Sequence, residues 1–81
     1  MVARRLDALA LGRGLRLLRE QRGLSQERLA ELIGSNAASL SRIEAGSRDV
    51  LWSSITRLLG AMGADLHDLA DAIDEATQRK S

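Results

Sequence analysis

The segment Ser25–Gly46, SQERLAELIGSNAASLSRIEAG, decides the fold of this chain. Its apolar residues keep helical spacing on both sides of Gly34, which interrupts the pattern. Asn36, like Ser25, stands immediately before a helical stretch, where a side-chain oxygen can accept a hydrogen bond from a free amide of the first turn. The segment therefore predicts two short helices, at residues 26–33 and 37–45, joined by a tight turn.

Another helix is predicted upstream, over residues 11–22, where leucines recur at four- and three-residue steps. Gly12 and Gly14 weaken the start of this helix, because glycine disfavours helix interiors. Residues 1–10 are therefore expected to form an N-terminal arm or a short extra helix, and residues 11–81 the domain itself.

Two further helices are predicted downstream. The first begins at or near Asp49 and ends before Gly63. The second is capped by Asp65, with Asp68 three residues later in the capping-box position. The apolar residues expected to face inward from the last four helices are Leu29, Ala30, Leu32, Ile33, Leu40, Ile43, Trp52, Ile55, Leu58, Leu59, Met62, Leu66, Leu69, Ile73 and Ala76.

Composition supports an all-α fold. The chain has 81 residues, enough for one domain, and 44% of them are hydrophobic, chiefly Leu, Ala and Ile. Trp52 is the sole aromatic residue, and β-branched residues are few, so strands are not expected. We predict a compact five-helix domain.

The residues that carry most enzymatic and metal chemistry are scarce. Without cysteine the chain can form no disulfide and no cysteine-ligated zinc site. The single histidine, His67, is expected to be an ordinary surface residue. The acidic side chains between Asp65 and Glu75 lack the glycine-containing loop of a calcium site, and a solvated face is the simpler interpretation. We therefore expect no enzymatic activity, no metal and no cofactor.

The sequence contains no apolar run near the ~20 residues that span a bilayer. Arg4 and Arg5 precede a short apolar stretch, but Asp7 interrupts it, which argues against a signal peptide. The expected location is the cytoplasm, away from membranes.

Charge is distributed unevenly along the chain. Residues 1–48 hold nine arginines against five acidic residues, whereas residues 49–81 hold three basic residues against six acidic ones. A basic half beside an acidic half favours contact of a polyanion with one end only. The alternative is ordinary solvated charge on helix faces.

Two short helices joined by a turn that contains glycine constitute a helix-turn-helix. The major groove of B-DNA accepts one α-helix, and in this motif the second helix presents its first residues to base edges. The segment therefore points to double-stranded DNA as a partner.

The sequence from Leu15 to Val50 resembles the Cro/repressor class of helix-turn-helix proteins, also called the xenobiotic-response-element family. The resemblance extends over residues 11–70. It is carried by Arg19, Gly23-Leu24-Ser25-Gln26, Leu29-Ala30, Gly34, Ser41-Arg42-Ile43-Glu44, Gly46, Ile55, Leu58, Met62-Gly63, Leu66 and Leu69. It implies a lambda-repressor-like fold. Ser35 departs from the apolar residue usual in the turn, and Val50-Leu51 replaces the usual proline-and-cap entry to the fourth helix.

The resemblance also assigns residues to roles. Gln26 matches a glutamine that touches a phosphate and braces the recognition helix, and Arg19 and Glu44 match a structural salt bridge. Arg42 can donate two hydrogen bonds to guanine, and alanine methyls can pack on thymine. The full set expected to contact DNA is Ser25, Gln26, Asn36, Ala37, Ala38, Ser39, Ser41, Arg42 and Arg48.

Each of these roles has a structural alternative. Ala37 and Ala38 are also good helix formers for an exposed turn. Arg42 could remain solvated or touch only phosphate, and Gln26 could simply begin a helix.

Members of the family usually pair so that two recognition helices enter successive major grooves. We expect a homodimer through the last two helices. The residues expected at this interface are Trp52, Met62, Leu66, Leu69 and Ile73. The alternative is that the stripe completes the core of its own monomer, and Trp52 in particular is expected to pack against that core.

These observations together predict a sequence-specific transcription regulator, expected to be a repressor. The alternative is an interaction module or antitoxin that uses the same fold to bind a protein partner, such as a toxin.

Overall fold

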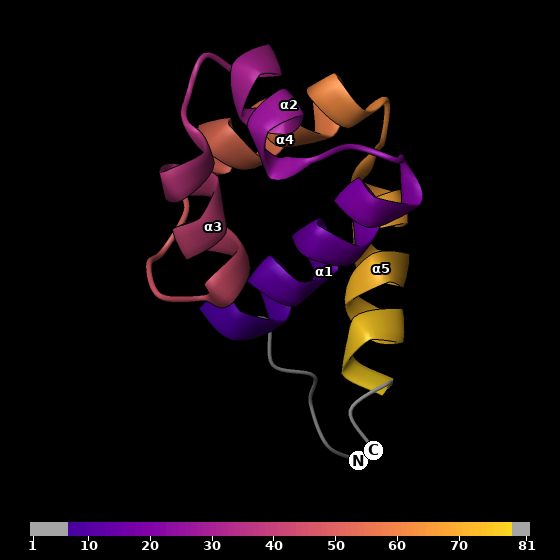
Figure 1. Cartoon of the computed structure of the whole chain (residues 1–81). Helices are drawn as coiled ribbons and strands as arrows, with labels where there is room; N and C mark the ends of the chain where they lie inside the picture. Colours follow the sequence, from indigo (N-terminus) through magenta and orange to yellow (C-terminus); the bar gives the residue numbers. More distant parts are fainter. Residues whose placement is uncertain (1–6, 79–81) are drawn as a thin grey trace.

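The computed structural model describes residues 7–78, which form five α-helices and no strand. The helices are α1 (Ala8–Gln21), α2 (Gln26–Leu32), α3 (Ala37–Ala45), α4 (Trp52–Met62) and α5 (Leu66–Gln78). α1 packs along α5 on one side and against α3 on the other, and α2 contacts both α3 and α4. Figure 1 shows α1 between α3 and α5. α2 and α4 lie at the top of this view. The predicted all-helical, five-helix fold is confirmed.

α1 begins at Ala8, three residues before the predicted start. The Asp7 side chain accepts a hydrogen bond from the Ala10 amide at 2.9 Å and caps the helix. The expectation that residues 1–10 lie outside this helix is therefore wrong for residues 8–10. Residues 1–6 of the predicted arm and residues 79–81 lie outside the described part of the chain.

Close helix packing explains the two glycines that obscured the start of α1. A Cβ atom at Gly12 would overlap the backbone carbonyl oxygen of Ile43 in α3, and a Cβ at Gly14 would overlap the Ile73 side chain in α5. Glycine at these positions lets α1 approach both neighbours, at a cost in helix propensity of about 1 kcal/mol each. Their presence in a helix interior reflects tertiary packing.

The core lies where these helices meet. Its most deeply buried large side chains are Leu15, Leu18, Leu29, Leu40 and Leu58. Burial of each such side chain contributes roughly 1.5–3 kcal/mol. Three residues predicted to face the core do not do so, since Leu32 is 45% exposed, Leu66 is 52% exposed and Trp52 is 60% exposed.

The starts of α4 and α5 show how well the capping residues in the sequence predict where a helix begins. Asp65 and Asp68 form the predicted capping box, each accepting a hydrogen bond from the backbone amide of the other at 2.9 Å. The bond from the Asp68 amide is the main cause that lowers the pKa of Asp65. α4 starts at Trp52, near Asp49 as expected, and its N-cap residue Leu51 provides no side-chain hydrogen bond.

None of the helices within residues 7–78 combines the length and apolar character that crossing a membrane requires. The same residues contain no group of three or more His, Asp or Glu side chains placed to hold a metal ion.

Candidate nucleic-acid interface

The turn between α2 and α3 fixes the direction in which α3 leaves. Gly34 adopts a left-handed conformation with φ of 69°, which L-residues with side chains rarely adopt. The Ser35 amide donates to the Ala30 carbonyl at 2.8 Å, which closes the turn onto α2. The Asn36 side chain then accepts from the Ser39 amide at 2.8 Å and starts α3. Both predicted caps, Ser25 and Asn36, have this role.

α3 has one buried side and one exposed side. Leu40, Ile43 and Glu44 are buried against the rest of the domain. Of the residues predicted to contact bases, Ala38 and Arg42 are exposed, as is their neighbour Ser41, while Ala37 and Ser39 are half-buried. The structure thus brings these residues together on the outward side of one helix, where a groove of DNA could meet them.

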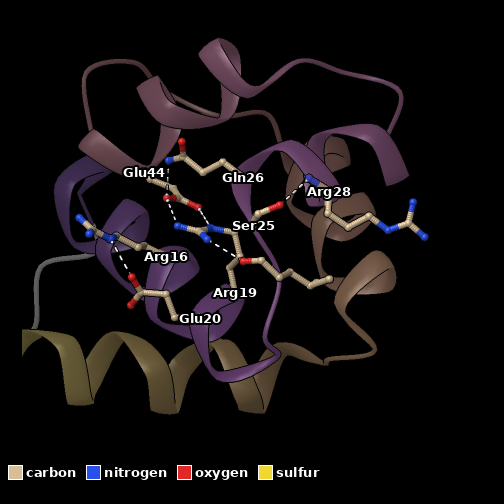
Figure 2. A network of polar contacts seen from close by, with 8 residues as sticks. Arg16, Arg19, Glu20, Ser25, Gln26, Arg28 and Glu44 are labelled. Carbon is tan, nitrogen blue, oxygen red and sulfur yellow. Dashed lines mark hydrogen bonds and ion pairs between the residues drawn. The ribbon is translucent and has the colours of Figure 1, made fainter.

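A buried ion pair fixes α3 against α1. Arg19 Nε donates to Glu44 Oε2 at 2.6 Å and Arg19 Nη2 donates to Glu44 Oε1 at 3.0 Å, the two-bond geometry in which arginine binds carboxylates most strongly. A third donor, Nη1, bonds to the Leu24 carbonyl at 2.7 Å. Bonding to Glu44 raises the pKa of Arg19, while burial acts in the opposite direction. Figure 2 shows this network.

Gln26 adds α2 to the same network. Its amide nitrogen donates to Glu44 Oε1 at 3.0 Å, so that one carboxylate links the first residue of α2 to α3. This is the bracing contact that the family resemblance implied. Ser25 accepts from the Arg28 amide at 3.0 Å, the capping bond at the start of α2. Contact of either residue with phosphate remains a prediction.

Arg48 follows α3 in the sequence, and its side chain lies back against that helix. Its Nη1 donates to the Ser39 hydroxyl at 3.3 Å. The chain turns back at Gly46, and the Ser47 amide and hydroxyl both bond to the Arg42 carbonyl at 3.1 Å. Arg48 is therefore placed next to the residues predicted to contact bases.

The predicted dimer residues separate into two groups. Met62, Leu69 and Ile73 are buried within the core of this single chain, as the alternative interpretation of the stripe predicted. Trp52 and Leu66 are more than half exposed. Sequence reasoning overlooked the adjoining Leu51, which is 73% exposed and had no helical periodicity to mark it.

Trp52 and Leu66 lie at the edge of an apolar groove between α1, α4 and α5. Its volume is about 450 Å³. The groove is lined by Leu11, Trp52, Ile55, Leu66, Leu69, Ala70, Ile73 and Asp74.

A family model described as a helix-turn-helix domain matches residues 10–72, most of the chain. The chain belongs to this helix-turn-helix family. The resemblance to Cro/repressor-type regulators is thereby confirmed, and the arrangement of α2 and α3 is the motif that gives the family its name.

Solved structures agree with this assignment. The helix-turn-helix protein is 29% identical to the clp gene regulator ClgR of Corynebacterium glutamicum, with a TM-score of 0.76 and coverage of 96% of both chains. It is 35% identical to the restriction-modification controller protein C.AhdI of Aeromonas hydrophila, with a TM-score of 0.72 and coverage of 76% of this chain and 94% of that one. No curated protein matched the sequence. The chain has the fold of DNA-binding transcription regulators.

Proposed function

We propose that this protein is a sequence-specific regulator of transcription, most simply a repressor, that places α3 in the major groove of double-stranded DNA as a homodimer. The observation that carries the proposal is the outward side of α3, where Ala38, Ser41 and Arg42 are exposed. The hydrogen bonds of Glu44 to Arg19 and Gln26 hold this helix against α1 and α2. Small side chains let the helix backbone approach the bases, and Arg42 provides two donors for guanine O6 and N7.

Electrostatics supports the same partner. The residues before Asp49 carry most of the arginines, and this half contains the whole helix-turn-helix. Phosphate contacts by arginine release counterions, so the affinity for DNA would fall steeply as salt rises. A regulator of this kind would act on DNA in the cytoplasm, the location expected from the sequence.

The homodimer rests on the exposed Trp52 and Leu66, which begin α4 and α5 and line one apolar groove. Apolar side chains that remain outside the core of a monomer mark an interaction surface when they are contiguous. Pairing there would present two copies of α3 to successive turns of the groove, about 34 Å apart.

Selection of bound duplexes from a random pool tests the proposal. The expected result is a two-fold symmetric motif with half-sites one helical turn apart. Arg42→Ala should then lose roughly 1–3 kcal/mol of discrimination at one base pair of each half-site, while retaining nonspecific affinity. Absence of affinity for every duplex at low ionic strength would refute DNA binding, and capture of a protein partner instead would favour an antitoxin or interaction module.

A further inference from the structure

A polar pocket lies beside the recognition helix, between the turn of the helix-turn-helix and the start of α4. Its volume is about 220 Å³, several times the roughly 30 Å³ that one water occupies in the liquid. Its polar lining residues are Ser35, Ser39, Arg48, Asp49, Ser54 and Arg57. The motif explains Ser39 and Arg48, but it gives no role to Ser54 and Arg57, which come from α4.

The two arginines of this pocket have unused hydrogen-bonding capacity. Arg48 spends one N–H on the Ser39 hydroxyl, out of the five that a guanidinium carries. Arg57 is exposed, and within residues 7–78 no carboxylate forms an ion pair with either arginine. Two cations from different elements therefore border one cavity, and Asp49, which also lines it, forms no ion pair with either of them.

The serine hydroxyls point to the same chemistry. Within the described residues, the hydroxyls of Ser35 and Ser54 form no hydrogen bond with the protein. Buried Ile43 and Leu58 also line the pocket, and apolar neighbours strengthen a charged hydrogen bond by reducing water access. Arginine and hydroxyl donors around a small concave site are the groups that bind phosphate oxygens.

We infer that this pocket holds one phosphate of the DNA backbone, bound by Arg48 and Arg57 with the Ser54 hydroxyl as a further donor. The inference rests on the proposed function and adds α4 to the DNA-binding surface. The charge of the pocket favours a backbone phosphodiester over a free phosphate. Asp49 offsets one of the two arginines, which leaves one positive charge for the single negative charge of a phosphodiester.

The test uses the full chain and its selected duplex. Arg57→Gln should weaken binding about tenfold at low salt, the loss expected for one charged hydrogen bond. It should also reduce the slope of log affinity against log salt by about one phosphate, that is by ~0.9. Arg57→Lys should restore the slope, because lysine keeps the charge. Circular dichroism of each variant verifies folding, and Arg57 is a surface residue that the core does not need.

Neutral methylphosphonates, placed one at a time along the duplex, locate the contact. At one position in each half-site the substitution should weaken binding of the wild type, and it should weaken binding of Arg57→Gln less, because only Arg48 and Ser54 still contact that phosphate in the variant. Asp49→Asn should tighten binding more than Asp71→Asn, which removes the same charge from the exposed side of α5. Inorganic phosphate, at constant ionic strength, should compete no better than chloride.

The inference is overturned if Arg57→Gln binds the duplex with wild-type affinity and slope. Selective competition by inorganic phosphate that disappears in Arg57→Gln would instead assign the pocket to a free phosphate ligand. Neither result contradicts the proposed function. The proposed function would fail only if the wild-type protein bound no duplex.

Discussion

Glu44 is the residue on which the position of the recognition helix depends most directly. Its carboxylate accepts two hydrogen bonds from Arg19 and one from Gln26, and its side chain is only 3% exposed. Arg19 in turn bonds to the Leu24 carbonyl, so the pair also fixes the loop before α2. A buried charge is tolerated when its partners are complete, and here they come from α1, α2 and α3.

Glu44→Ala is therefore expected to destabilise the domain strongly. The change leaves the Arg19 guanidinium buried without its carboxylate, which costs about 3–5 kcal/mol in proteins where such pairs have been broken. Urea unfolding followed by circular dichroism measures the loss. Glu20→Ala is the matched control, because it removes the exposed partner of Arg16 and should cost at most about 0.5 kcal/mol. Equal losses in the two variants would show that the buried pair contributes little.

The helices differ in how much of each could be predicted from local sequence. The predicted bounds of α3 agree with the structure, because Asn36 and Gly46 act on their own immediate neighbours. The start of α1 was predicted wrongly because the function of Gly12 and Gly14 depends on α3 and α5, which are distant in sequence. Similarly, no periodicity could show that Leu32 stays exposed while Leu29 is buried.

A matched pair of glycine substitutions tests the packing of α1. Gly12→Ala should destabilise the domain by about 1–3 kcal/mol, because the new methyl group overlaps the α3 backbone at Ile43. Gly60→Ala should stabilise it by roughly 0.5–1 kcal/mol, since Gly60 is exposed in α4 and a Cβ there meets nothing within 4 Å. Thermal unfolding of both variants distinguishes packing from helix propensity. If both substitutions stabilised the protein, the close approach of α1 and α3 would be in doubt.

At the scale of the whole molecule, the polar pocket and the apolar groove are lined by different residues. The outward side of α3 and the polar pocket lie on the part proposed to meet DNA, whereas the apolar groove lies between α1, α4 and α5. The sequence predicted a single apolar stripe on the last two helices but could not show which of its residues are buried and which are exposed. Leu69 and Ile73 complete the core, and Trp52 and Leu66 stay exposed, because the approach of α1 covers only part of the stripe.

The exposed part of the stripe predicts how the protein assembles. Leu66→Asp should convert a dimer into a monomer in sedimentation equilibrium while the helical content is unchanged, because Leu66 is 52% exposed and the core does not require it. Trp52, the only tryptophan, reports the same event, and its fluorescence should shift to the blue as the wild type associates.

Leu9→Asp is the control for adding an acidic group to an exposed leucine, since Leu9 is 44% exposed near the start of α1 and does not line the groove. It should remain dimeric. Leu66→Asp should lose affinity for the complete symmetric site but bind an isolated half-site as the wild-type monomer does, because α3 itself is unchanged. If Leu66→Asp sedimented like the wild type, the copies would have to pair through another surface, and the spacing of the two recognition helices would have to be derived from that surface.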